Sequence, residues 1–353
     1  MEKGKKGESA MDHQDRRSVL ACVGAVIGAG FVSGREIYSF FTRYGAASWG
    51  LILLAAATMV FLCALCMRRA QQENAGCWCG LKCFSDTKLG ALARGCVAML
   101  MLVTGGAMVS AAGHLVQLLW PSEWAYPLGA AGTLILAWML GFRGVGPLSA
   151  VSGFLTVFFI GVMLVLLRRP GMGESVVQEQ TPPGGLIFAA IRAVAYGSMN
   201  MTVAIGVTCR AEKGAHGCRC CDRRALMTGL VLAGLLFGAN ALYLRFPGLQ
   251  QEAFPIVRLF RSFRRTGYVV CVALLYLAVL TTLTAVLYAL RDDLGSRGVK
   301  PPLAAALTMG LPLAVSVVGF AGIVDGLYTP VGLGCLGLVF LPMLFSGRSP
   351  RRT

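Results

Sequence analysis

Long apolar stretches, each about twenty residues long and almost free of charge, alternate with short polar segments along this chain. A helix needs about 20 apolar residues to cross the hydrocarbon core of a bilayer. We therefore expect an all-α integral membrane protein with ten transmembrane helices that contacts the lipid bilayer. The expected spans are residues 18–41, 45–67, 95–121, 124–142, 144–167, 184–209, 225–244, 267–290, 301–320 and 326–345.

The composition excludes the main soluble classes of protein. Hydrophobic residues make up 56% of the 353 residues and charged residues only 14%, whereas soluble domains are about half apolar and a quarter charged. The formal net charge of +16 would suggest a nucleic-acid partner in a soluble domain. Here most basic residues lie in loops between apolar stretches, so the membrane explains them and no nucleic acid is expected.

The distribution of lysine and arginine predicts the orientation in the membrane. Most of them fall on one side if the N-terminus is cytoplasmic, and this arrangement also places the C-terminus in the cytoplasm. We expect five segments. They are a polar N-terminal tail (1–17), a first five-helix repeat (18–167), an external connection (168–183), a second five-helix repeat (184–345) and a basic C-terminal tail (346–353).

An amphipathic pattern lies on the side expected to be external, between the seventh and eighth spans. Apolar residues recur there at helical spacing with arginines between them, which is typical of a helix lying in the membrane interface. Such a helix either anchors the protein or covers an external vestibule as a lid. The residues are Ile256, Leu259, Phe260 and Phe263, with Arg258, Arg261, Arg264 and Arg265.

The spacing of the spans suggests an internal repeat. Spans six to ten follow spans one to five at an offset close to half the chain length. Because each half contains an odd number of helices, the two halves would lie upside down relative to one another. Inverted repeats of this kind are found in many secondary transporters.

Glycines are concentrated at the middle of the first span, where Gly24, Gly28, Gly30 and Gly34 lie within eleven residues. Each glycine costs about 1 kcal/mol relative to alanine in a helix interior, so we expect this helix to be broken. A break exposes amides that suit a carboxylate and carbonyls that suit a cation. The alternative is close helix packing through small residues.

The middle of the sixth span reads Tyr-Gly-Ser-Met-Asn from residue 196. We expect a second break there, opposite the first, so that both broken helices contact the solute. The expected solute-binding residues are Gly28, Ala29, Gly30, Phe31, Ser33, Tyr196, Gly197, Ser198 and Asn200.

Three motifs resemble the YkvI family of bacterial membrane proteins. The first is the run GAGFVSGREI from Gly28, followed by Phe40-Phe41 and Tyr44-Gly45, where the family typically reads GAGFASGQE. The run from Tyr196 to Asn200 is similar to the YxxYN pattern of the sixth helix. Thr281-Thr282 followed by Tyr288 is similar to a TT…Y pattern of the eighth. Arg35 departs from the family, which usually has glutamine there.

The resemblance implies an architecture and a location. The YkvI family is grouped with the amino acid–polyamine–organocation superfamily, whose members share a LeuT-like 5+5 inverted repeat with helices 1 and 6 broken. A member of such a family would lie in the bacterial cytoplasmic membrane. It would carry a small amino-acid-like solute by alternating access, driven by Na⁺ or H⁺.

The resemblance also implies an ion site. In LeuT-type symporters, hydroxyls of helix eight and carbonyls at the break of helix one hold Na⁺. Transferred to this sequence, the ligands would be Thr281 and Thr282 with carbonyls near Ala25 and Gly28. The alternative is that each threonine bonds to a carbonyl of its own helix, as is common in membrane helices.

Three ionisable residues within spans are candidates for function. Glu36 is an acid within the first span and would act in coupling or gating, as a proton carrier or as the counter-charge of a cationic solute. The alternative is an ion pair with Arg35, Arg43 or Arg192. We expect Arg192 to extend towards the outer interface. We expect His114 to have a backbone partner, with a proton relay as the alternative.

Two predicted cytoplasmic loops are rich in cysteine. Cytosolic thiols stay reduced, so the loops either supply zinc ligands or carry tolerated cysteines, and their spacing matches no standard zinc finger. The residues are Cys77, Cys79, Cys83, Cys218, Cys220 and Cys221.

No motif of soluble catalysis is present, since the sequence lacks GxSxG, a Walker loop and HExxH. We therefore expect no enzyme activity and no cofactor beyond a possible Na⁺ ion. Transport without a nucleotide site must use an ion gradient. Two alternatives are a non-transporting membrane sensor or scaffold that keeps the transporter fold, and a membrane enzyme built on the loop thiols.

Overall fold

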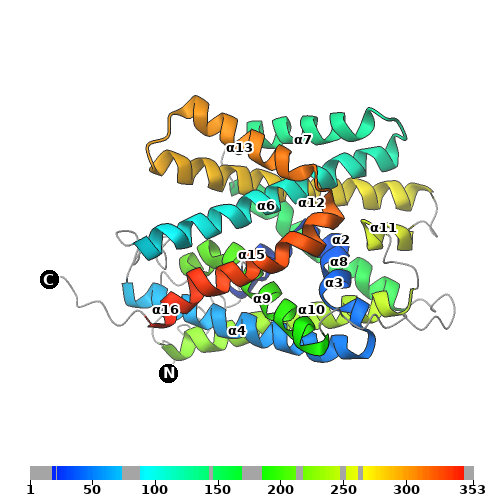
Figure 1. The fold of residues 1–353 in the computed structure, drawn as a ribbon. Coiled ribbons are helices and arrows are strands. Elements are labelled where there is room, and N and C mark those ends of the chain that lie inside the picture. The colour runs from blue at the N-terminus through cyan, green and yellow to red at the C-terminus, as the bar shows by residue number, and fades with distance from the viewer. Residues whose placement is uncertain are drawn as a thin grey trace, which may run out of the picture.

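The computed structural model describes residues 18–20, 22–73, 88–142, 146–168, 185–211, 218–246, 252–260 and 265–345. These residues form helices and turns, with no strand among them, and the long helices run roughly side by side (Figure 1). The main helices are α4 (Ser48–Glu73), α6 (Lys88–Leu119), α7 (Ala125–Gly141), α8 (Gly146–Leu167), α9 (Gly185–Ala211), α10 (Cys218–Leu244), α12 (Arg265–Ser296) and α13 (Pro301–Ser316).

Six helical segments among the described residues are long and apolar enough to cross a membrane, namely Thr42–Ala70, Lys88–Leu119, Gly185–Ile205, Cys220–Leu244, Arg265–Ser296 and Phe320–Phe345. Three shorter apolar helices accompany them, at Ala125–Gly141, Gly153–Leu167 and Pro301–Ser316. Large apolar side chains remain exposed on the outside of the molecule, including Ile187 at 77% and Val317 at 85%. Surface of this kind suits contact with lipid rather than water.

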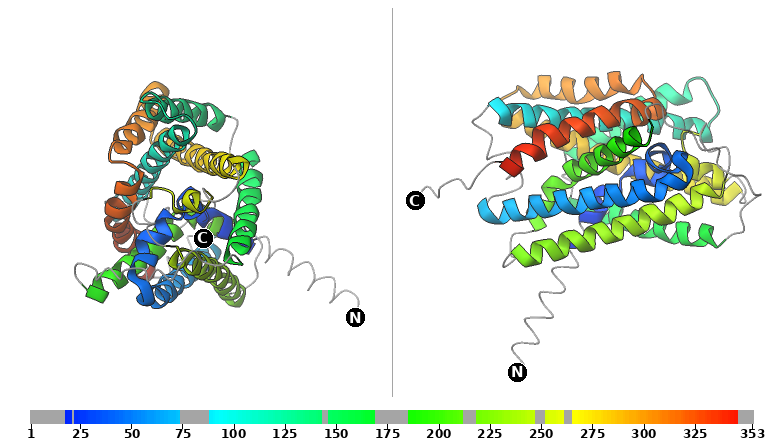
Figure 2. Two further views of the ribbon diagram at one scale, coloured as in Figure 1. Left: turned by 90° about the vertical axis from the view of Figure 1, so that its right-hand side faces the viewer. Right: turned by 60° about the horizontal axis from the view of Figure 1, so that its bottom comes forward.

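The helices pack in two groups that share the interior. Helix α4 packs against α9 and α10, and α6 packs against α7, α12 and α13. The last apolar segment crosses between the groups and contacts both α6 and α9 (Figures 1 and 2).

The predicted break in the first span is present. Residues 22–26 are helical, Ile27 and Gly28 are not, and the chain resumes as α2 (Ala29–Ser33) and α3 (Arg35–Phe40). Gly28 is extended, with ψ −175°, and Gly34 between the two short helices is left-handed, with φ 82°. The chain thus changes direction twice within seven residues, and Gly34 is the position whose backbone conformation favours glycine.

The predicted break in the sixth span is wrong, because α9 is continuous from Gly185 to Ala211. Its one central glycine serves helix packing. A Cβ on Gly197 would lie 3.0 Å from the carbonyl oxygen of Ala55 and 3.0 Å from the Cβ of Thr58. The small residue thus lets α9 approach α4 closely, as small residues do in membrane helix pairs.

An unexpected irregularity lies in the last span. Gly319 is left-handed, with φ 83°, and the helix that follows contains two π-helical segments. The segment consists of α14 (Phe320–Gly322), the π-helix η3 (Ile323–Leu327), α15 (Tyr328–Cys335), the π-helix η4 (Leu336–Phe340) and α16 (Leu341–Phe345). π-Bulges inside helices are often found at functional sites.

Candidate functional site

The carboxylate of Glu36 folds back onto α2, the short helix between the two interruptions of the span. A Cβ on Gly30 would overlap the Glu36 carboxylate, so the acid lies directly against the backbone of α2. In a continuous helix, residues 30 and 36 would be about 9 Å apart along the axis. The turn at Gly34 removes this separation. Glu36 is consequently placed at the break rather than beyond it.

Glu36 is buried, with 7% of its surface exposed. The ion pair with Arg35, Arg43 or Arg192 that was the alternative for Glu36 is not formed, and no ion pair or hydrogen bond to its carboxylate exists within the described ranges. Its neighbours are two buried tyrosines, Tyr196 of α9 and Tyr328 of α15, which both interact with it electrostatically. Three separate helices thus meet around one buried acid.

Arg35, the residue before Glu36, holds the outer part of the site together. It forms an ion pair with Asp325 of η3 and donates a hydrogen bond of 3.0 Å from Nη1 to the Glu252 carbonyl. The exposed fractions of the Arg35 and Asp325 side chains are 9% and 35%. Sequence reasoning missed this pair because it placed Asp325 between the ninth and tenth spans. A lone acid next to glycines in apolar sequence was the available signal.

Arg192 is buried, so the expected extension to the interface is wrong. It is 5% exposed and donates a hydrogen bond of 2.9 Å from Nη2 to Ser39 Oγ. Its guanidinium lies 4.9 Å from the ring centroid of Phe40. The ring and the hydroxyl of α3 hold the arginine inside the protein, because they supply a cation–π contact and an acceptor.

Tyr196 faces the broken helix from α9. Its ring centroid lies 5.1 Å from those of both Phe40 and Phe41, and its buried hydroxyl has no hydrogen-bond partner among the described residues. Asn200 donates a hydrogen bond of 2.9 Å back to the Tyr196 carbonyl, and the buried Ser198 hydroxyl has no partner in the described structure. Of the residues predicted in the sixth span, Tyr196 therefore packs against the C-terminal end of α3.

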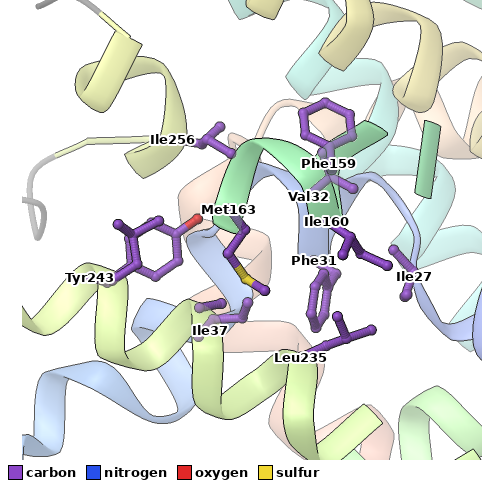
Figure 3. Close-up of a pocket in the computed structure, with 12 residues that line it drawn as sticks. Ile27, Phe31, Val32, Ile37, Phe159, Ile160, Met163, Leu235, Tyr243 and Ile256 are labelled. Carbon is purple, nitrogen blue, oxygen red and sulfur yellow. The ribbon is translucent and has the colours of Figure 1, made fainter. Parts of the chain in front are cut away.

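The predicted residues of the first span divide between support and lining. Ser33 Oγ donates to the Gly30 carbonyl at 2.7 Å and accepts from the Arg35 amide at 3.2 Å, which stabilises the turn between α2 and α3. Ala29 is buried beside them. Phe31 lines a separate apolar cavity (Figure 3).

That apolar cavity lies between the break and helices α8 and α10. Ile27, Phe31 and Val32 line it from the first span, and Phe159 and Leu235 face them (Figure 3). Its volume of about 30 Å³ corresponds to roughly one water molecule. The break is thus closed on this side, with no room for an amino acid.

A larger cavity of about 180 Å³ lies nearer the end expected to be external. His114 and Gln117 of α6 line it, together with Glu252 and the start of α11 (Pro255–Phe260). The His114 ring pairs its Nδ1 with the Ser110 carbonyl at 3.0 Å, which is the expected backbone partner. A helix, α11, is present at the predicted position, and its place in the membrane interface stays a prediction. Its residues Ile256, Val257 and Leu259 are buried against the protein, while residues 261–264 lie outside the described ranges.

The predicted ion ligands are brought together in part. A Cβ on Gly28 would lie 3.8 Å from Thr282 Oγ1. The Gly28 amide donates to the Val26 carbonyl at 2.8 Å, and no backbone amide of the described residues donates to the Ala25 carbonyl. Thr281 and Thr282 both donate to the Ala278 carbonyl at 2.9 Å. Their protons are therefore used within the helix, while their oxygen lone pairs remain able to accept.

The cysteine set is only partly within the structure. Residues 77, 79 and 83 lie outside the described ranges, as does the side chain of Cys218. Cys221 is buried in α10 and Cys220 is partly exposed. The described residues contain no group of three or more His, Cys, Asp or Glu side chains that could hold a metal. The zinc hypothesis remains a prediction.

Comparison with known proteins extends the resemblance beyond the motifs. No family model matches the chain. The chain is 24% identical over 337 residues to the uncharacterized membrane protein YkvI of Bacillus subtilis (strain 168), and the alignment covers 94% of this chain and 95% of that protein. The similarity therefore extends over nearly the whole of both chains. This chain is a membrane protein homologous to YkvI.

Proposed function

We propose that this protein is a secondary active transporter that carries a small amino-acid-like solute by alternating access, coupled to Na⁺ or H⁺. The observation that carries this proposal is the double interruption of the first span at Gly28 and Gly34, with the buried acid Glu36 against Gly30. Non-helical backbone within a membrane is tolerated only against protein or a cavity. In many transporters such a break forms the solute or ion site.

The packing of the helices supports an inverted repeat of ten spans. The broken segment would be the first span. The shorter helices α7, α8 and α13 would be the fourth, fifth and ninth spans. In an inverted repeat, contacts between the two halves occur as symmetry-related pairs, and several such pairs are present. Helix α4 contacts α9 as α10 contacts α3, α6 contacts α13 as α12 contacts α7, and α8 contacts α10 as α16 contacts α4.

Two coupling routes fit the geometry. Glu36 is a buried acid without an ionic partner among the described residues, and such a group can take up a proton or answer the positive charge of a solute. The oxygens of Thr282 and of the loosened backbone near Gly28 are hard ligands that suit Na⁺. Both routes act at the same break, so the coupling ion and the solute would both bind at the interrupted first span.

The ion pair of Arg35 with Asp325 would close the site from outside. It joins the second half of the broken span to η3 and, through the Glu252 carbonyl, to the segment before α11. Opening would require the bundle of spans one, two, six and seven to rock against the others, which would separate these groups. Helix α11 would then act as the lid that its sequence suggested.

Uptake by proteoliposomes tests the proposal. The purified full chain is reconstituted, a panel of radiolabelled amino acids is added outside, and a Na⁺ or pH gradient is imposed. Transport predicts accumulation that collapses when the gradient is removed by an ionophore. A non-transporting sensor or scaffold predicts no accumulation above protein-free vesicles with any member of the panel.

A further inference from the structure

Two buried charges of opposite sign lie on facing helices without pairing. Arg192 of α9 is 5% exposed and Glu36 of α3 is 7% exposed. Within the described residues, neither takes part in an ion pair. An isolated buried charge is costly unless a partner neutralises it. The protein thus keeps two buried ionisable side chains that form no ion pair with any described residue.

Each of the two residues lies one helical turn from an aromatic residue of its own helix. Phe40 follows Glu36 by four residues and Tyr196 follows Arg192 by four, so each pair shares one helix face about 6 Å apart along the axis. The Arg192 guanidinium lies over Phe40, the Phe40 ring contacts Tyr196, and Tyr196 interacts electrostatically with Glu36. The order across the site is therefore arginine, two aromatic rings, and acid.

Neighbouring groups satisfy Arg192 only in part, since Nη2 donates to Ser39 Oγ, the Phe40 ring lies under the guanidinium and Tyr44 also interacts with it. The acid that acts on it electrostatically is Asp325, which already pairs with Arg35, and Arg43 adds a charge of the same sign. Its Nε is buried without a hydrogen-bond partner. A carboxylate oxygen can accept a hydrogen bond from this unfilled donor, since guanidinium groups form charge-assisted hydrogen bonds with carboxylates.

A polar group near Glu36 also lacks a hydrogen-bond partner. Beside Glu36, the buried Tyr196 hydroxyl lacks a hydrogen-bond partner among the described residues. An ammonium group has three donors and no acceptor, so it can engage a carboxylate and a hydroxyl oxygen together. The aromatic rings between the two ends offer an apolar wall for the carbon atoms that connect them.

We propose that the solute is a zwitterion whose carboxylate is bound by Arg192 and whose ammonium group is bound by Glu36. This inference rests on the proposed function, in that it takes the broken span as the solute site, and it names the residues that select the solute. One molecule that carries both charges neutralises both buried groups, while an anion or an amine alone leaves one of them uncompensated. The site should therefore reject singly charged analogues.

Ligand charge and protein charge can be varied independently to test this. Binding to the purified full chain in detergent is measured for the standard amino acids, β-alanine and 4-aminobutyrate. The best zwitterion is then compared with its amide, which lacks the carboxylate, and its N-acetyl derivative, which lacks the ammonium group. We expect each derivative to bind the wild-type protein at least about tenfold more weakly, the loss typical of a charged hydrogen bond.

The variants should remove these preferences one at a time. Arg192→Gln should bind the zwitterion no better than its amide and still discriminate against the N-acetyl derivative. Glu36→Gln should do the reverse. Arg168→Gln, on an exposed arginine at the end of α8, is the matched control and should keep both preferences. Arg192→Lys, which keeps the charge, covers the case in which the glutamine variant does not fold.

The outcomes separate this inference from the proposed function. Equal binding of the zwitterion and either derivative to the wild type, retention of both preferences by Arg192→Gln, or no binding of any zwitterion would overturn the inference. Binding of chloride or acetate as tight as that of the zwitterion would also overturn it, because the site would then be a simple anion site. The expected binding pattern without gradient-driven uptake would overturn the transport proposal and leave the zwitterion site in place.

Discussion

The carboxylate of Glu36 occupies the space that a side chain at Gly30 would need. This contact joins the short helices α2 and α3 of the interrupted first span, and it depends on the left-handed turn at Gly34. The glycine-rich run therefore has two separate duties. Gly28 and Gly34 change the direction of the chain, and Gly30 makes room for the acid that the change of direction brings back.

Asp325→Asn should destabilise the protein and loosen the outer closure. Arg35 is almost completely buried, so replacing Asp325 with a neutral amide weakens the compensation of its charge. We expect a loss of about 2–3 kcal/mol, below the range for fully buried pairs because Asp325 is partly exposed. Thermal unfolding in detergent measures this.

The control for Asp325 is a second ion pair, between Arg68 and Asp222. It has two short hydrogen bonds, of 2.8 and 2.6 Å, but its side chains are 50% and 45% exposed. Exposed pairs contribute about 0–1 kcal/mol, so Asp222→Asn should have little effect. Equal melting temperatures for the two variants would contradict the role assigned to Asp325.

Gly34→Ala should be more harmful than Gly185→Ala. Both glycines are left-handed, with φ of 82° and 74°, and alanine there costs roughly 1–2 kcal/mol. At Gly185 nothing lies within 4 Å of the added Cβ, whereas at Gly34 it would overlap the Tyr243 hydroxyl. Melting temperatures compare the two, and a Gly34→Ala loss no larger than that of Gly185→Ala would show that the close contact is unimportant.

Thr282→Ala should weaken any sodium dependence of binding or uptake, because it removes the oxygen beside Gly28. We expect the half-saturating Na⁺ concentration to rise at least about tenfold. Thr284→Ala is a matched control, since this buried threonine also donates to its own helix, to the Leu280 carbonyl at 2.7 Å. An unchanged Na⁺ dependence in Thr282→Ala would remove the proposed sodium site.

Hydrogen exchange should distinguish the broken first span from the continuous sixth. The amides of Ala29 and Gly30 follow the break and donate no backbone hydrogen bond to a helical carbonyl among the described residues. The centre of α9, in contrast, is helical throughout. Peptides that cover residues 27–30 should therefore exchange faster than those that cover 195–200. The reverse order would mean that the wrong span is interrupted.

Local sequence signals predicted the apolar helices and the first break, because span length and glycine density act through the backbone itself. They failed at α9, where Gly197 has the same identity as the glycines of the break but packs against α4. Only the neighbouring helix distinguishes these two uses of a glycine. A single glycine in a long apolar helix carries too small a penalty to unwind it.

The charged residues show the same limit. Glu36 was identified from its position in an apolar span, but its contact with Gly30 depends on a turn whose angle no pattern encodes. The Arg35–Asp325 pair joins residues 290 positions apart, and the burial of Arg192 depends on Phe40 and Ser39 of a different helix. Such partners follow from the assembled fold rather than from spacing along the chain.

The most direct test of the transport site is gradient-driven uptake by the paired variants Gly30→Ala and Gly24→Ala in proteoliposomes. A Cβ at Gly24 meets nothing within 4 Å, whereas one at Gly30 displaces the Glu36 carboxylate. With both variants folded by size-exclusion chromatography, we predict wild-type uptake for Gly24→Ala and a loss of at least about tenfold for Gly30→Ala, equivalent to about 1.4 kcal/mol. Full uptake by Gly30→Ala would contradict the placement of the transport site at this break.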